Sequence, residues 1–198
     1  MPKLPQHAHP LLLRAAVFRL LDTCVLLQED MAGYYRTAAL EKVNGIEQVF
    51  QWFQKRQVKV ILLSDLDRSD TDIILGRLGW NVGLSRTNDV LIDHVLLVNS
   101  VYGNNPLFRV MQLLGDTSPS QLITVGDSPN ILRWSAEAEI LVNIGVTYGG
   151  TSYRTLIKEP HHGLLDSPRD IPNFLLEQLL GRSENNSNWA IYPSQPMM

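Results

Sequence analysis

Five short apolar runs, separated by segments with helical spacing, constrain the fold of this 198-residue chain more than any other feature. The runs are rich in β-branched residues and nearly continuous in hydrophobicity, which is typical of strands buried on both faces of a sheet. They comprise residues 15–21, 58–64, 93–98, 122–127 and 140–146. Strands that alternate with helices in this order form right-handed βαβ units. The sequence therefore predicts an α/β fold with a central parallel sheet covered on both faces.

Helices are expected between the strands and after the last one. In residues 44–57, apolar side chains recur at helical spacing at Ile46, Val49, Phe50 and Phe53. The other expected helices span residues 71–80, 106–115, 130–139 and 171–180.

The length of the chain suits one domain with a core of ordinary size. We assign residues 15–181 to this domain, residues 1–14 to an N-terminal extension and residues 182–198 to a C-terminal tail. The tail carries three side chains that could pack on the domain itself or reach a neighbouring subunit: Trp189, Ile191 and Tyr192.

Composition argues against several classes of partner. A net charge of −3 and a pI of about 5.9 provide no long-range attraction to nucleic acid or to an anionic membrane. No uninterrupted apolar run is long enough to span a bilayer, and we identify no signal peptide. The single cysteine, Cys24, rules out an internal disulfide, so a reducing, cytoplasmic location fits best. No basic residue lies near Cys24 in the sequence, which favours an inert thiol.

The residues that follow each predicted strand are the candidate functional residues. In open parallel sheets, ligands bind beyond the carboxyl ends of the strands. These positions are 19–24, 64–67, 100–103 and 126–131.

Four segments around these positions resemble the haloacid dehalogenase (HAD) superfamily and, within it, the phosphonatase-like hydrolases. The family's nucleophile strand and loop resemble VFRLLDTCV, and its second motif resembles VKVILLSDLDRSDTDIILGRLGW. Its acidic motif, with the helix before it, resembles PLFRVMQLLGDTSPSQLITVGDSPNILRW. Its C-terminal stretch resembles NIGVTYGGTSYRTLIKEPHHGLLDSPRDIPNFLLEQL. The resemblance runs from about residue 15 to residue 180 and implies a three-layer, Rossmann-like fold.

The resemblance also implies a chemistry that this chain lacks at most of its reactive positions. Family members use an aspartate nucleophile, an acidic residue two positions later, a basic residue that steadies the phosphate, and aspartates that hold Mg²⁺. The corresponding residues here are Arg19, Leu21, Val101 and, for the further aspartate, Ile131. An arginine cannot attack phosphorus, because its guanidinium is protonated and only donates hydrogen bonds. We therefore expect no catalytic residue.

What remains of the family's site is a vestigial pocket of small polar residues beside Arg19. It consists of Arg19, Thr23, Ser64, Gly126, Asp127 and Ser128. Asp127 is the only candidate metal ligand, and a single carboxylate makes a poor Mg²⁺ site, so we expect no cofactor. Arg19 could bind an anion or pair with Asp127; the pair is better motivated, because a partly buried charge needs a partner.

Other acidic and basic residues receive plainer interpretations. Asp22 is expected to point away from Arg19, and its use as a shifted nucleophile would require a one-residue slip of the strand. Asp65, Asp67, Asp70 and Asp72 resemble a Ca²⁺ loop only superficially, because the loop glycine and the terminal glutamate are absent. Capping of a helix by Ser69 or Asp70 explains this acidic stretch. His161 and His162 are expected in a surface loop rather than in a zinc site.

The family's helical cap is also reduced. Only residues 25–43 lie between the strand loop and the first expected helix, which is too short for a helical bundle and suits one short helix or a flap.

We therefore expect a catalytically degenerate protein, a pseudoenzyme, that acts as a structural, assembly or regulatory binding partner, within a homo-oligomer or with another protein. Two alternatives stay open. One is a HAD-type phosphatase or phosphonatase-like hydrolase with weak or altered activity that works through Asp127, with Mg²⁺ as its cofactor. The other is a sensor that binds a phosphorylated metabolite at Arg19 and Ser64. Fold alone does not decide among them.

Overall fold

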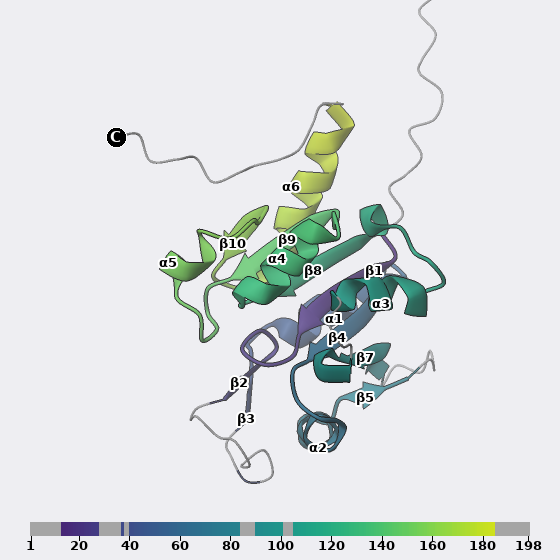
Figure 1. Cartoon of the computed structure of the whole chain (residues 1–198), viewed down its shortest axis with the longest axis vertical. Coiled ribbons are helices and arrows are strands. Elements are labelled where there is room, and N and C mark those ends of the chain that lie inside the picture. Colours follow the sequence, from purple (N-terminus) through teal and green to yellow (C-terminus); the bar gives the residue numbers. More distant parts are fainter. Residues whose placement is uncertain (1–12, 28–36, 38–39, 84–89, 101–104, 185–198) are drawn as a thin grey trace, which may run out of the picture.

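The computed structural model describes residues 13–27, 37, 40–83, 90–100 and 105–184, and its centre is a six-stranded sheet (Figure 1). All of its pairings are parallel, which confirms the predicted sheet. The strand order is β10 (Gly163–Leu165), β9 (Val142–Val146), β8 (Leu122–Gly126), β1 (Ala15–Arg19), β4 (Lys59–Ser64) and β7 (His94–Leu97). The sequence did not predict β10, because three residues are too few to show a strand pattern.

β1 lies inside the sheet, with strands added on both of its sides, and this arrangement positions the candidate site. β1 pairs with β4 on one side and with β8 on the other. The strands β4 and β7 extend the sheet one way, while β8, β9 and β10 extend it the other way. Ligands of such sheets bind at this switch point, beyond the carboxyl ends of the strands. Arg19, the last residue of β1, lies at that point.

Helices cover both faces of the sheet, as the three-layer expectation requires. One core lies between the sheet and the helices α1 (Ile46–Gln54), α2 (Arg68–Leu78) and α6 (Ile171–Glu184). The other core lies under α3 (Pro106–Leu113), α4 (Pro129–Glu137) and the short α5 (Tyr153–Leu156). Figure 1 shows α3 and α4 in front of the sheet.

Aromatic packing explains how α1 is held on the sheet. Its apolar residues at helical spacing are all buried, and they include Phe50 and Phe53. Both rings meet Phe18 of β1 edge-on, with ring centroids 5.1 and 5.9 Å apart. Edge-to-face pairs of this kind stabilise a core beyond their buried area.

The helix boundaries differ from the sequence-based prediction by a few residues, and the start of α2 and the end of α6 matter most. α2 begins at Arg68, and its cap is Asp67, whose side chain accepts a hydrogen bond from the backbone N–H of Asp70. The prediction that Ser69 or Asp70 caps this helix was wrong, because these two residues lie inside its first turn. α6 ends at Glu184, three residues inside the range assigned to the tail.

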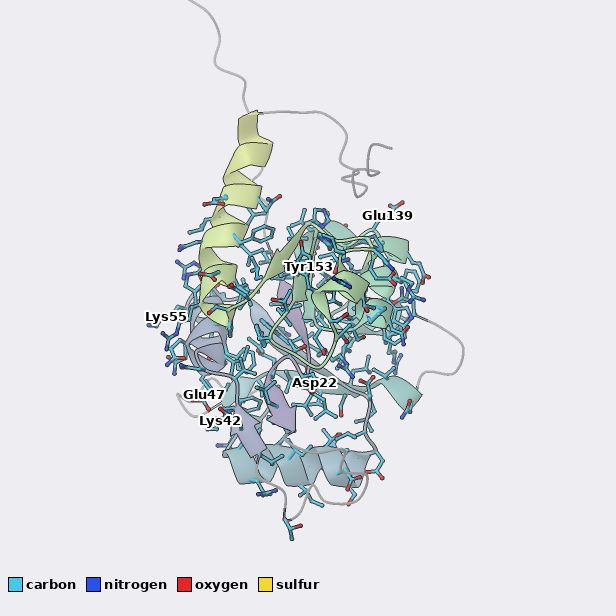
Figure 2. All side chains as sticks on the ribbon, turned by 90° about the vertical axis from the view of Figure 1, so that its left-hand side faces the viewer. Asp22, Lys42, Glu47, Lys55, Glu139 and Tyr153 are labelled. Atoms are coloured by element: carbon cyan, nitrogen blue, oxygen red, sulfur yellow. The ribbon has the colours of Figure 1, made fainter. Side chains whose placement is uncertain are left out.

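A two-stranded antiparallel ribbon stands where the family's cap would begin. It consists of β2 (Val25–Leu27) and β3 (Leu40–Lys42), so the described part of this segment is a flap. Lys42 donates to Glu47 of α1 at 2.7 Å, and the same oxygen accepts from Trp80 at 2.6 Å. Lys42 and Glu47 are labelled in Figure 2. A second small pair, β5 (Asn81–Val82) and β6 (Val90–Ile92), lies beyond α2.

Three 3₁₀ turns complete the described chain: η1 (Val98–Ser100), η2 (Pro119–Gln121) and η3 (Pro168–Asp170). Among the residues with assigned positions, no helix combines the length and the apolar character that crossing a membrane requires. Several predicted features lie outside the described residues: most of the N-terminal extension, Val101, and the tail residues Trp189, Ile191 and Tyr192.

Candidate functional site

Arg19 is the centre of a cluster of charged side chains at the carboxyl end of the sheet. Its Nη1 donates to Asp127 Oδ1 at 2.6 Å, so the expected ion pair with Asp127 is present. Its Nε donates to Asp65 Oδ2 at 2.8 Å, and Nη1 also approaches the backbone oxygen of Leu21 at 3.3 Å. We call Arg19, Asp22, Asp65 and Asp127 the Arg19 cluster.

Sequence reasoning missed the role of Asp65, which it placed among helix-capping residues. Arg19 pairs in register with Leu63, and Asp65 follows the end of β4 directly. The carboxyl ends of neighbouring parallel strands meet at the same edge of a sheet, so the position of Asp65 was the available signal. Asn99 of η1 donates to the backbone oxygen of Asp65 at 2.7 Å and holds this residue in place.

The expectation that Asp22 points away from Arg19 was wrong. Its Oδ2 lies 3.6 Å from Arg19 Nη1. The alternation of side chains holds only along a strand, and β1 ends at Arg19. Asp22 then adopts a φ of 60°, a left-handed conformation that turns the chain back toward the cluster.

The cluster contains more negative than positive charge. One guanidinium faces three carboxylates, which leaves two negative charges uncompensated when all groups are ionised. Burial lowers the pKa of Arg19, but the charges of Asp127 and Asp65 and their hydrogen bonds outweigh burial and raise it. Burial and the nearby Asp127 raise the pKa of Asp22, while Arg19 opposes this shift. An approaching phosphate anion would meet this excess of negative charge.

Thr23 and Tyr148 fix the position of Asp127 through a chain of hydrogen bonds. Asp127 is only 1% exposed; Thr23 Oγ1 donates to its Oδ1 at 3.3 Å and accepts from its backbone N–H at 3.1 Å. Tyr148 Oη donates in turn to the backbone oxygen of Thr23 at 3.1 Å, and burial raises the pKa of this phenol. The hydroxyl group of Thr23 therefore uses both its donor and an acceptor position on Asp127.

The hydroxyl groups of Ser64 and Ser128 likewise form hydrogen bonds within the protein. Ser64 is fully buried, and its Oγ lies 2.8 Å from Thr71 Oγ1. Thr71 donates its own hydroxyl proton to the backbone of Asp67, so Ser64 must donate to Thr71. Ser128 caps α4 by accepting from the N–H of Ile131.

Two of the residues that the family resemblance placed at reactive positions lie in the hydrophobic core. Leu21 and Ile131 are both buried. A Cβ atom at Gly126 would lie 2.4 Å from Ile131 Cγ2, so Ile131 occupies the space directly above the glycine.

The described residues do not fit a bound Mg²⁺. The oxygens of Leu21, Asp65 and Asp127 are of the kind that Mg²⁺ prefers, but they already surround the guanidinium of Arg19. The same part of the chain contains no group of three or more His, Cys, Asp or Glu side chains that could hold a metal ion.

The histidine pair and the cysteine lie apart from this chemistry. His162 Nδ1 accepts from the backbone N–H of Asn143 at 3.0 Å, at the edge between β9 and β10. Cys24 is buried, and burial raises its pKa well above the ordinary value, as expected for an inert thiol. A cleft of about 300 Å³ opens between the base of the flap and η3, and its lining includes Lys42, Tyr148 and Arg169.

Comparison with known proteins places the fold. No protein-family model matches the chain, and no curated protein matches it. A solved predicted phosphatase from Clostridium acetobutylicum superimposes with a TM-score of 0.64 at 13% identity, covering 84% of this chain and 99% of that one. A predicted phosphoglycolate phosphatase from Haemophilus somnus gives 0.60 at 16% identity, over 72% of this chain and 61% of that one.

A third solved structure carries the family's name. It is a haloacid dehalogenase-like hydrolase from Streptococcus pneumoniae, with a TM-score of 0.56 at 12% identity over 69% of this chain and 60% of that one. The chain thus spans about three fifths of the length of two of these three proteins. At identities this low, the structural similarity shows the fold alone, and the chemistry has to be argued from the site. The chain has the Rossmann-like α/β fold of haloacid dehalogenase-like phosphatases.

Proposed function

We propose that this protein is a non-catalytic HAD-like protein, a pseudoenzyme that acts as a structural, assembly or regulatory binding partner. The observation that carries the proposal is the place of Arg19. Its guanidinium lies 2.6 Å from Asp127 at the switch point of the sheet, where the family places its nucleophile and its metal. The permanently charged guanidinium of Arg19 then holds Asp127 in place.

The hydrogen bonds around Arg19 support this proposal. Arg19 connects the ends of β1, β4 and β8 through Asp65 and Asp127. Thr23 and Ser64, the small polar residues retained from the family's pattern, use their hydroxyl groups on protein partners. Buried polar groups that are satisfied within the protein stabilise the fold without a ligand.

The charge of the Arg19 cluster weakens the sensor alternative. A phosphorylated metabolite carries negative charge, and three carboxylates surround the arginine that would have to bind it. Like charges at these distances repel strongly in a partly buried site. Ser64, the other residue of the proposed sensor site, is fully buried and donates its proton to Thr71.

The hydrolase alternative has its own support, because the solved structures of the same fold are described as phosphatases or hydrolases. It would require a carboxylate other than residue 19 to attack the phosphate, with Asp127 released from Arg19. Asp22 and Asp65 are the partly exposed carboxylates of the cluster, at 32% and 38%.

Hydrolysis of p-nitrophenyl phosphate, measured with and without Mg²⁺, distinguishes the pseudoenzyme proposal from the hydrolase alternative. We expect no rate above that of buffer under either condition, because position 19 has no nucleophile. A Mg²⁺-dependent rate that disappears in Asp127→Asn would overturn the proposal in favour of the hydrolase. The same assay on Asp22→Asn would identify a shifted nucleophile if a rate were present.

A further inference from the structure

The cleft of about 300 Å³ between the flap, the start of α1 and η3 is lined by no residue of the Arg19 cluster. Its volume is at the small end of the range for ligand pockets, which suits a small molecule. Its apolar wall consists of Leu26, Val43, Tyr148 and Pro168. Val43 and Pro168 are buried, and Tyr148 is fixed by the hydrogen bond from its phenol to the loop after β1. The wall is therefore held rigidly by the fold.

Arg169 crosses the start of α1 and is held there by two contacts. Its Nη2 donates to Asn44 Oδ1 at 2.9 Å. Its stem lies against Gly45, where a Cβ atom would come within 2.7 Å of Arg169 Cγ. Gly45 also has a φ of 96°, which favours glycine at this position. The guanidinium is thus positioned at the cleft, and within the described part of the chain it has no carboxylate partner.

Asp166 lines the same cleft and carries the opposite charge. Its side chain is exposed and forms no ion pair with any residue that the structure describes. Asp166 and Arg169 lie three positions apart, yet they do not pair, because the guanidinium is directed across the start of α1. Of the other charged residues in the lining, Lys42 is paired with Glu47, and Glu41 adds a second carboxylate. The cleft therefore presents a cation and a carboxylate that the fold keeps apart.

We propose that this cleft is a binding site for a free amino acid with an apolar side chain. The carboxylate of the ligand pairs with Arg169, its ammonium group pairs with Asp166, and its side chain packs on the apolar wall. An amino acid carries both charges on neighbouring atoms, whereas the two termini of a peptide lie further apart.

The chemistry of the two side chains supports this ligand class. The parallel N–H donors of an arginine match the two oxygens of a carboxylate. Side chains that are already held in position lose little freedom when a ligand binds. Binding at this cleft does not depend on whether the Arg19 cluster catalyses a reaction.

An NMR titration of the ¹⁵N-labelled full chain with L-leucine tests the site. We expect the backbone amides of Asn44, Gly45, Ser167 and Arg169 to shift along one saturable binding curve. Two analogues separate the charges of the ligand: 4-methylpentanoate lacks the ammonium group, and 3-methylbutylamine lacks the carboxylate. Each should bind at least about tenfold more weakly than L-leucine, because each loses one charge-assisted contact. These titrations use the unaltered protein, so they do not depend on the folding of a variant.

Two variants assign the contacts to side chains. Arg169→Gln should weaken the binding of L-leucine by about tenfold. It should not weaken the binding of 3-methylbutylamine, which has no carboxylate for the arginine to bind. Asp166→Asn should weaken the binding of L-leucine but not that of 4-methylpentanoate. Arg154→Gln is the matched control, because Arg154 is an exposed cation of α5 that does not line the cleft, and this variant should bind L-leucine as the unaltered protein does.

Several results would overturn the site. They are the absence of a saturable shift with L-leucine, shifts confined to residues outside the cleft, and analogues that bind as tightly as L-leucine. Equal weakening of L-leucine and 3-methylbutylamine in Arg169→Gln would also contradict it, because a merely structural role of Arg169 would affect both ligands. A loss of binding in Arg154→Gln would contradict it too, because binding would then follow the total charge of the protein.

Discussion

Arg19 is the cation around which three carboxylates gather at the carboxyl end of the sheet. The residue ends the central strand of the sheet, where three neighbouring strand ends can be joined by one fork of N–H donors. A guanidinium is always charged and offers donors in fixed directions, which suits it to hold two carboxylates at once. The chemistry of position 19 therefore favours a permanent internal contact over a reaction.

The first prediction concerns the Arg19–Asp127 pair. Arg19→Ala should destabilise the fold by about 3–5 kcal/mol, because it leaves the buried Asp127 without its cation. Asp127→Ala should cost less, since Arg19 keeps Asp65 as a partner. The double variant should lose clearly less than the sum of the two single losses. Urea unfolding of the three variants measures these free energies.

Arg68→Ala is the control for this cycle. Arg68 also pairs with an aspartate, Asp72 at 2.9 Å, but both side chains are exposed. Exposed pairs contribute about 0–1 kcal/mol, so this variant should be nearly neutral. Additive losses at Arg19 and Asp127 would mean that the two residues do not stabilise the fold as a pair.

Asp65 provides a second prediction at the same scale. Its side chain is 38% exposed, so water can replace part of its contact with Arg19. Asp65→Asn should therefore cost about 1 kcal/mol, well below the loss in Arg19→Ala. Thermal unfolding of both variants side by side gives the comparison, and equal losses would contradict the ranking.

At the scale of elements, the flap ribbon is fastened to the domain through α1. Glu47 of α1 accepts hydrogen bonds from Lys42 of β3 and from Trp80. These bonds lower the pKa of Glu47, since they favour its charged form. A carboxyl whose folded pKa is lowered stabilises the fold above its unfolded pKa, and this stability is lost as the pH falls through the folded pKa.

Glu47→Gln should accordingly destabilise the protein by about 1 kcal/mol at neutral pH, because a charge-assisted bond becomes a neutral one at a half-exposed site. The difference from the unaltered protein should shrink below pH about 4.3, the ordinary pKa of a glutamate. Denaturant unfolding at several pH values measures both effects. Glu177→Gln, at an exposed position of α6, is the control and should show neither effect.

At the scale of the whole molecule, the proposal predicts a fold that needs no metal. A ligand that binds only the native state at a hundredfold excess over its Kd adds roughly 2.7 kcal/mol of stability. We expect millimolar Mg²⁺ to leave the Tm unchanged relative to a monovalent salt of the same ionic strength. A clear upward shift of Tm that Asp127→Asn abolishes would show that the cluster binds the metal.

Light scattering after size exclusion would give the oligomeric state on which a role in assembly depends. The proposed role as a binding partner predicts that the protein elutes from a native extract at a larger mass than the pure protein does. Equal masses in both samples would contradict the proposed role as a stable binding partner.

The sequence by itself determined the architecture and the centre of the site. Hydrophobic periodicity is local, so it predicted five of the six strands of the central sheet and five of the six described helices, all but the short α5. The order of the motifs predicted that Arg19 and Asp127 meet, since both lie at the carboxyl ends of neighbouring strands. The tertiary structure alone decided which other carboxylates join them. Asp22 returns to Arg19 through a left-handed turn, and Asp65 reaches it across the sheet end. Such contacts depend on how the chain turns after a strand, where side chains no longer alternate and no periodic pattern can place them.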